Sequence, residues 1–224
     1  MSGAPELVRP WRGVSPEQRI AERRERLLEA ALEVFSARTF RGSKVRDICS
    51  EAGLTERYFY ESFRNKEALL GALADRIVTD FVAAAAPSIA LAATDIDAAI
   101  HDGVRDFVAS LTDDPRRARI LFIESVGVSA AAETKRRAVI ASLVEVVRGA
   151  TEQAFGAWVR DSVEVELIAR SLIGAASELL VAYVREELPL DQDELALNIS
   201  RLFQRGRPIL VAMAAERSKN QAGS

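Results

Sequence analysis

The sequence predicts an all-α protein. Apolar residues recur at intervals of three and four along nearly all of the chain, which is the spacing of one helix face. Glycine (12 residues) and proline (7 residues) are sparse among 224 residues, and no stretch alternates apolar and polar residues as a half-exposed strand does. Hydrophobic residues make up 49% and charged residues 28%, so a disordered or collagen-like chain is excluded.

The first helix is predicted from the residues at its start. Residues 1–14 form a polar stretch that we expect to be a mobile tail. Ser15 can then cap a helix, Pro16 suits the first turn, and Gln18 can bond back to the cap. Apolar residues with helical spacing continue to about Ala37, so one long amphipathic helix is expected here.

Two short helices joined by a tight turn follow. The first is expected over 44–52, with Ser43 as its cap, and Gly53 ends it because glycine readily adopts the left-handed conformation at a helix end. Thr55 caps the second short helix, which Phe63 closes. Two such helices packed on a longer first helix make the helix-turn-helix arrangement.

The rest of the chain is predicted to be helical as well. Asn65 caps a fourth helix that Pro87 ends, and Gly206 and Pro208 are expected to kink or split the last helix. Further helices are expected over residues 94–111, 114–125, 133–155, 163–188 and 191–217.

The outward face of the second short helix is suited to DNA. It offers a guanidinium group for guanine edges or phosphate, a carboxylate that can accept from cytosine, and two phenols. Two lysines stand at helix starts, where backbone N–H groups already favour phosphate. The residues expected to contact DNA are Lys44, Thr55, Glu56, Arg57, Tyr58, Tyr60 and Lys66.

Alternatives remain open for two of these residues. Glu56 repels phosphate, so it either reads a base or only stabilises the helix dipole. Tyr60 either contacts phosphate or packs in the core. The charge supports contact with a polyanion at this end, because residues 1–66 hold 13 Lys and Arg against 10 Asp and Glu, whereas residues 67–224 hold 17 against 23.

These segments resemble the N-terminal domain of the TetR family of transcriptional regulators. The resemblance is carried by Gly42–Ile48, Ala52–Thr55, Tyr58–Phe63 and Asn65–Leu70, and it extends over about residues 21–81. It implies that Tyr60 and Lys66 contact phosphates and that residues 55–58 enter the major groove. Arg57 and Ser62 depart from the residues frequent in the family, so the resemblance does not imply an operator sequence.

The C-terminal part contains a helix that is apolar on nearly all sides, over residues 172–184. Such a helix cannot leave a face in water, so we expect two helices from each of two copies to form a four-helix bundle. The expected homodimer interface comprises Leu172, Ala176, Leu180, Tyr183, Leu195, Ile199, Leu202 and Ile209. Glu178 lies inside this run and would need a partner if buried, either an arginine or a ligand.

An apolar pocket is expected between the fourth helix and the long helix after it. The resemblance implies that a small-molecule effector binds there and weakens DNA binding. The candidate ligand-binding residues are Phe81, His101, Phe107, Phe122, Trp158 and Glu178. Ordinary packing or a surface position is the alternative for His101 and Trp158.

The composition argues against catalysis. The single Cys49 and the single His101 exclude a disulfide framework and a Cys₄ or Cys₂His₂ zinc site. Most metalloenzyme and Cys–His catalytic schemes fall away as well, so no enzyme, cofactor or metal is expected. No signal peptide is visible and the early apolar stretch is too short to span a bilayer, so we expect a cytoplasmic protein without a membrane partner.

The sequence thus predicts an N-terminal three-helix helix-turn-helix DNA-binding domain over 15–66, with the motif at about 44–63. An effector-binding and dimerisation domain is expected over 67–224. The predicted function is a ligand-responsive regulator, namely a repressor that leaves a palindromic operator when a largely apolar effector binds; activation is the alternative mode. The alternatives are an all-helical carrier or enzyme that keeps the N-terminal unit as scaffold, and a non-specific nucleoid-type binder, against which the acidic body argues.

Overall fold

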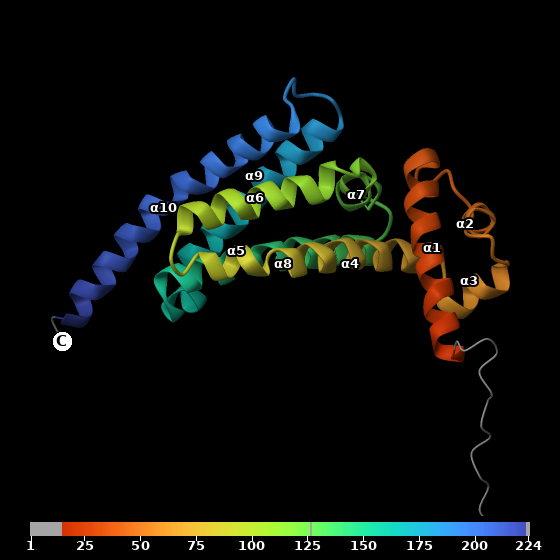
Figure 1. Ribbon diagram of the computed structural model, residues 1–224, viewed down its shortest axis with the longest axis horizontal. Helices are drawn as coiled ribbons and strands as arrows, with labels where there is room; N and C mark the ends of the chain where they lie inside the picture. Colours follow the sequence, from red (N-terminus) through yellow and green to blue (C-terminus); the bar gives the residue numbers. More distant parts are fainter. Residues whose placement is uncertain (1–14, 126, 223–224) are drawn as a thin grey trace, which may run out of the picture. The chain divides into compact units, whose positions relative to one another are not determined.

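The computed structural model describes residues 15–125 and 127–222, and these residues form helices and no β-strand (Figure 1). The all-α prediction is therefore confirmed for the described part of the chain. The predicted mobile tail, 1–14, lies outside the described residues. The chain divides into two compact units, Met1–Ala72 and Leu73–Ser224. Helix α4 (Lys66–Ala84) contributes residues to both units.

The first unit packs α1 (Pro16–Arg38) against α2 (Val45–Ala52) and α3 (Glu56–Ser62). The expected start of α1 is confirmed by a capping box. The Ser15 N–H donates to Gln18 Oε1 at 2.8 Å, and the Gln18 N–H donates to Ser15 Oγ at 3.2 Å. The fully buried side chains of this unit include Leu27, Ala31, Phe35, Ile48, Phe59 and Leu69.

The turn between α2 and α3 has the predicted left-handed glycine. Gly53 has φ 61°, and its N–H donates to Ser50 O at 3.1 Å. A Cβ at this position would lie 3.0 Å from Arg26 Nη2. The turn therefore favours glycine for its backbone conformation, whereas the end of the Arg26 side chain can move to make room.

The cap predicted for α2 was wrong. Lys44 occupies the N-cap position, and its N–H donates to Asp47 Oδ2 at 2.8 Å. Ser43 is buried instead, and its hydroxyl donates to Phe40 O at 2.9 Å. The start of α2 is thus fixed by the Asp47 carboxylate and not by the Ser43 hydroxyl.

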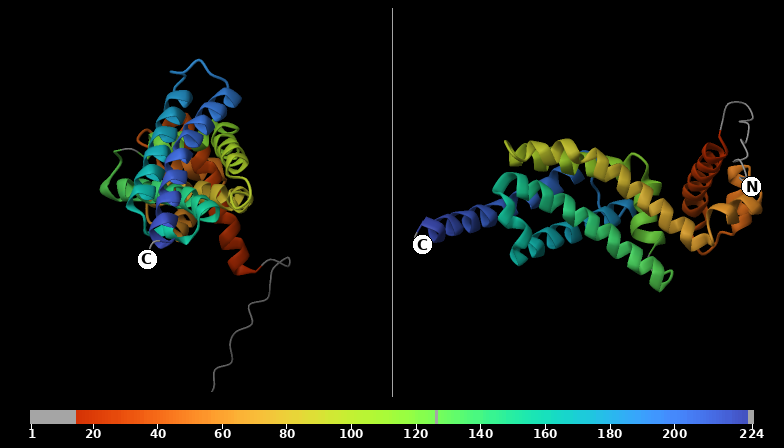
Figure 2. Two further views of the ribbon diagram at one scale, coloured as in Figure 1. Left: turned by 90° about the vertical axis from the view of Figure 1, so that its left-hand side faces the viewer. Right: turned by 90° about the horizontal axis from the view of Figure 1, so that it is seen from below.

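The second unit comprises the end of α4 and the helices that follow it. These are α5 (Ala86–Leu91), α6 (Ile96–Thr112), α7 (Pro115–Arg119), η1 (Ile120–Glu124), α8 (Ala130–Phe155), η2 (Ala157–Asp161), α9 (Val163–Val184) and α10 (Gln192–Ala222). Helices α6 and α10 lie side by side (Figure 1). The C-terminal part of α10 extends past the other helices of the unit (Figure 2).

Two of the sequence predictions for this unit needed correction at prolines. Pro87 lies in the first turn of the short helix α5, so it starts a helix as well as following the end of α4. Pro208 lies inside α10, which is not split. A single proline removes one backbone donor, and the hydrogen bonds on either side can continue the helix.

Other helix boundaries differ from the predicted ones because the contacts that set them do not appear in the spacing of apolar residues. Helix α8 begins at Ala130, capped by Ser129 Oγ, three residues before the expected start. The helix expected over 114–125 changes at Ile120 into the π-helix η1. There the Ser125 hydroxyl donates to Ile120 O at 2.6 Å, a contact between residues five apart that helical periodicity does not predict.

Candidate functional site

The surface of α3 holds most of the residues that the sequence assigned to DNA. Thr55, Glu56 and Arg57 are exposed, and the side chain of Arg57 is 84% accessible. Its Nε donates to Glu61 Oε1 at 3.0 Å, one turn along the helix. Tyr60 is 57% exposed, whereas Phe59 beside it is fully buried. The helix therefore presents a cation and a phenol outward while an aromatic ring fixes its inner face.

Two arginines of α1 contact aromatic residues in and next to α3. Neither arginine was among the predicted site residues. The Arg23 guanidinium lies 4.4 Å from the ring centre of Tyr58, which is half-buried. Arg24 lies 4.3 Å from the ring centre of Phe63, and its Nη1 donates to Ser62 O at 3.2 Å. Tyr58 thus packs beneath an arginine, and its ring is less free to meet DNA than that of Tyr60.

A third arginine of α1 braces the turn before α3. Arg26 Nη2 donates to Ala52 O at 2.5 Å and to Gly53 O at 3.3 Å. These carbonyl groups belong to the C-terminal end of α2, where cations are favoured. The only signal in the sequence was a basic residue at helical spacing from Arg23, which is also typical of a solvated helix face.

Lys66 makes contacts inside the unit. Its Nζ donates to Phe40 O and, at 2.6 Å, to Ser43 O, and it lies 4.3 Å from the centre of the Phe40 ring. Burial lowers the pKa of the Lys66 ammonium below its ordinary value, although the charge of Asp47 opposes the shift. The ammonium group that we expected at a phosphate is thus directed toward the loop that precedes α2.

We therefore expect Lys66→Met to destabilise the N-terminal unit by about 1–3 kcal/mol, because the carbonyl groups of two buried residues lose a donor. Chemical denaturation followed by circular dichroism measures this loss. Lys44→Met is the matched control, because Lys44 is exposed at the N-cap of α2. An unfolding free energy that is equal in the two variants would contradict the internal role of Lys66.

The second unit encloses an apolar cavity of about 990 Å³, counting the space at its open mouth. Phe81 and Phe107 line it as predicted, with ring centroids 4.9 Å apart and an interplanar angle of 64°. Residues of α4, α5, α6, α8, α9 and α10 contribute to its wall. The largely apolar wall is that of a small-molecule site.

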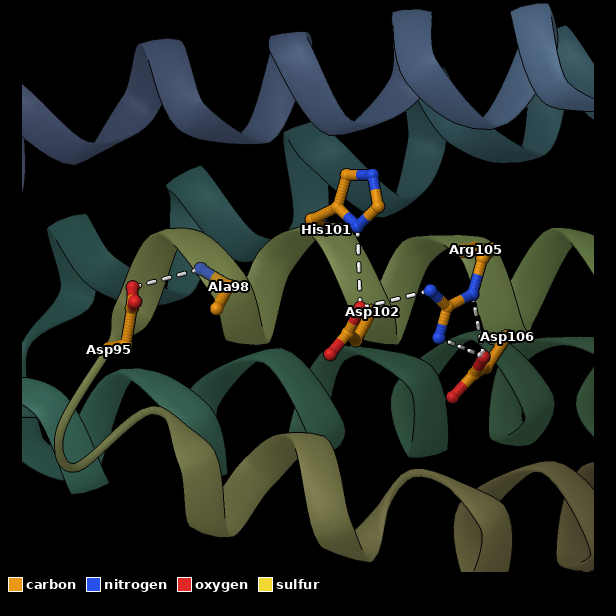
Figure 3. A network of polar contacts seen from close by, with 6 residues as sticks. All are labelled: Asp95, Ala98, His101, Asp102, Arg105 and Asp106. Atoms are coloured by element: carbon orange, nitrogen blue, oxygen red, sulfur yellow. Dashed lines mark hydrogen bonds and ion pairs between the residues drawn. The ribbon is translucent and has the colours of Figure 1, made fainter.

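His101 does not line this cavity, contrary to one of the two readings of the sequence. It is exposed on α6, where its Nδ1 lies 3.3 Å from Asp102 Oδ1 (Figure 3). Arg105 pairs with the same Asp102 and with Asp106. The surface alternative for His101 is the correct one, because it falls on the polar face of an amphipathic helix.

Three further candidates also lie outside the cavity wall: Phe122, Trp158 and Glu178. Phe122 belongs to η1 and is half-buried. Trp158 lies in η2, where its Nε1–H donates to Phe155 O at 2.7 Å and its ring faces Arg217. Glu178 is exposed, so the cost expected for a buried carboxylate does not arise.

The predicted dimer interface was wrong at four of its eight positions. These are Ala176, Leu180, Leu195 and Ile199, which are buried within the chain itself. Leu172 lines the cavity. Tyr183 and Leu202 are half-buried, and Ile209 is 53% exposed. A helix that is apolar on all sides gives no sequence signal for which side faces the chain's own core.

Helix α9 keeps a second, exposed apolar face. Val163 is 70% and Leu167 59% exposed, and on α10 Ile209 and Val211 are exposed as well. This double-sided composition gives α9 a mean hydropathy of 1.6, so by length and composition alone it is the one described helix that could cross a membrane. Its opposite face, which includes Ile173 and Leu180, is buried in the unit.

Comparison with known proteins finds sequence similarity in the N-terminal unit. Residues 27–73 match the model of the bacterial regulatory proteins of the tetR family. A Bacillus subtilis (strain 168) protein described as an uncharacterized HTH-type transcriptional regulator, YdgC, is 45% identical over 60 residues. Residues 27–73 therefore resemble the DNA-binding domain of TetR-family regulators. The match to the B. subtilis regulator spans 27% of this chain and 29% of that protein, so this similarity is confined to the helix-turn-helix region.

The likeness to solved structures extends over both units of the chain and is one of fold. A TetR-family regulator from Syntrophomonas wolfei has a TM-score of 0.70 and 19% identity, covering 85% of this chain and 96% of that one. FadR from Bacillus subtilis, solved in complex with stearoyl-CoA, has a TM-score of 0.68 and 18% identity, covering 80% and 96%.

Proposed function

We propose that this chain is a homodimeric, ligand-responsive transcriptional regulator of the cytoplasm. It acts as a repressor that leaves a palindromic operator when an apolar effector occupies the cavity. The observation that carries the proposal is the presence, in one chain, of an outward-facing α3 on a helix-turn-helix and a large apolar cavity. A DNA-reading surface alone suits any DNA-binding protein, whereas the added cavity suits one that responds to a small molecule.

The DNA-binding part of the proposal depends on α3. Arg57 can form a bidentate pair with a guanine edge once it leaves Glu61, and Tyr60 can donate to a phosphate. The pair between Arg57 and Glu61 is exposed, so separating it costs about 1 kcal/mol or less. The residues at the start of α3 are therefore available to a major groove.

Arg57→Ala is expected to weaken operator binding by about 1–3 kcal/mol and to relax the preference for one base pair. Fluorescence anisotropy with the operator and with single-base variants measures both effects. Arg64→Ala serves as control, since Arg64 is an exposed arginine of the same unit outside α3. Unchanged operator affinity in Arg57→Ala would show that α3 is misplaced as the reading helix.

The dimer part of the proposal depends on the exposed face that α9 and α10 share. A Cβ at Gly206 would lie 3.8 Å from Ile168 Cγ2, so the two helices are adjacent at this level. Leu167 and Ile209 flank that contact in the sequence, and both are exposed. A second copy that packs here covers both side chains and gives a two-fold arrangement suited to a palindromic operator.

The effector part of the proposal rests on the cavity. FadR of B. subtilis, which shares this fold, was solved with stearoyl-CoA, and the cavity wall here is largely apolar. We infer an effector with an aliphatic chain. Helix α4 carries Phe81 of the cavity and Lys66 of the DNA-binding unit, so it can couple the two, and about 1–3 kcal/mol of coupling suffices for a switch.

Ala150→Trp is expected to abolish effector binding and leave a repressor that stays on DNA. Ala150 lines the cavity, so an indole at this position fills its space. Ala141→Trp is the matched control on the same helix, because Ala141 is exposed. Calorimetric titration with decanoate measures the effect, and equal affinity in both variants would show that the ligand binds elsewhere.

A gel-shift experiment with the DNA upstream of the chain's own gene separates the proposal from its alternatives. A specific, salt-dependent complex that withstands random-sequence competitor by about 10³-fold is expected. A carrier or enzyme forms no such complex at any salt concentration, and random-sequence competitor DNA displaces a nucleoid-type binder.

Among the residues that the structure describes, no group of three His, Cys, Asp or Glu side chains could hold a metal ion.

A further inference from the structure

The cavity has a single charged side chain in its wall, among the residues that the structure describes. This side chain is Arg207 of α10. The polar side chains otherwise found there are the hydroxyl groups of Ser88 and Thr151, and the Thr151 hydroxyl already donates to Val147 O at 2.8 Å. The wall therefore offers one cation against an otherwise apolar surface.

Arg207 lies where the cavity meets solvent. Its residue belongs to the cavity wall, and yet its side chain is 44% exposed. Its Nη1 contacts Asp97 Oδ2 of α6 at 2.5 Å, and Asp97 is 46% exposed. Ile96, the neighbour of Asp97, also lines the cavity. The ion pair thus joins α6 to α10 at the opening.

The internal carboxylate shows which chemistry the opening accepts. An arginine guanidinium is planar and always charged, and it can hold a carboxylate or phosphate through two parallel hydrogen bonds. Asp97 supplies such an oxygen from within the chain itself. Because the pair is exposed, it contributes little to stability, so an incoming anion can replace Asp97 at small cost.

We propose that the cavity selects an amphiphile with an aliphatic chain and an anionic head, and that the head displaces Asp97 from Arg207. The chain enters the apolar interior while the head stays at the half-exposed guanidinium. Asp97 then tunes the affinity for anionic ligands, since its carboxylate competes with the ligand's anion for Arg207. This inference rests on the proposed ligand response and adds the head-group chemistry to it.

The experiment compares three probes of equal chain length, below their micellar concentrations: decanoate, 1-decanol and decanoyl-CoA. Calorimetric titration of the full chain is expected to show that decanoate binds about 10-fold or more tightly than decanol. Arg207→Gln should weaken decanoate about 10- to 100-fold and leave decanol unchanged. Arg205→Gln, an exposed arginine on the same helix outside the cavity wall, should change neither.

Asp97→Asn provides an independent test that does not remove the cation. Without its competing carboxylate, Arg207 should bind decanoate a few-fold more tightly, by up to about 5-fold. The two anionic probes distinguish the source of the head. If decanoate depends on Arg207, the head is a carboxylate, and if only decanoyl-CoA does, the head is a phosphate of the carrier.

The proposal is overturned if neither anionic probe depends on Arg207, or if Asp97→Asn leaves both affinities unchanged. Its failure differs from that of the proposed function. Release of operator DNA by decanoate at equal concentrations in the parent chain and in Arg207→Gln would keep the regulator and remove the head-group assignment. Binding of decanoate that depends on Arg207 without any change in operator affinity would keep the assignment and remove the ligand response.

Discussion

Leu167→Arg is expected to convert the protein into a monomer and to lower its operator affinity by about 10²-fold or more. Leu167 is 59% exposed in the single chain, so an arginine there does not disturb the core of its own unit. In the proposed dimer the same side chain is covered, and two arginines would meet near the two-fold axis without partners. Loss of the dimer removes the second half-site contact, which is an avidity effect.

Sedimentation equilibrium measures the mass directly. The parent chain is expected at twice 24.5 kDa and the variant at 24.5 kDa. Ile20→Arg is the control, because Ile20 is a similarly exposed apolar residue (51%) of α1, outside the proposed interface. A Leu167→Arg variant that remains dimeric would place the interface on another face of the molecule.

Phe59→Ala is expected to unfold the N-terminal unit at ordinary temperatures. Phe59 is fully buried and packs against Phe63 at 6.0 Å between ring centroids. Truncation of a buried phenylalanine costs about 3–5 kcal/mol, which is most of the stability of a unit this small. Operator binding should disappear with the fold, while the C-terminal unit should keep its helical signal and its ligand affinity.

Tyr60→Ala distinguishes loss of fold from loss of contact. Tyr60 is the next residue on α3 and is 57% exposed, so its removal should cost about 1 kcal/mol or less in stability. Its operator affinity should fall nonetheless, because the phenol is a proposed phosphate contact. Thermal unfolding followed by circular dichroism compares the two variants, and equal stability losses would contradict the burial assigned to Phe59.

Local sequence signals were sufficient for the helix-turn-helix. The Ser15–Gln18 capping box, the Gly53 turn and the Asn65 cap, whose Oδ1 accepts from Ala68 N–H at 2.8 Å, each involve residues a few positions apart. The exposure of Arg57 and the burial of Phe59 follow from helical periodicity between those fixed points. The periodicity could not show that Lys66 reaches back to the loop at Phe40, because that contact spans 26 residues.

The C-terminal unit was less predictable for a physical reason. Its helices are rich in apolar residues on more than one side, so the sequence indicated burial without indicating the partner of each face. Leu180 was therefore expected at an interface and lies in the core, whereas Leu167 was not singled out and is exposed. Arg207 was overlooked because its position at the cavity depends on Asp97, 110 residues earlier in the chain.

The most direct test of the account is to select binding sequences from random DNA with the purified full chain and to footprint the selected site. The account predicts a palindrome with two protected major-groove patches whose centres are about one helical turn (roughly 34–36 Å) or a multiple of it apart, and loss of both patches in Leu167→Arg. Selection of no common sequence, or of a single unrepeated patch, would contradict the proposal that two copies of α3 read DNA together.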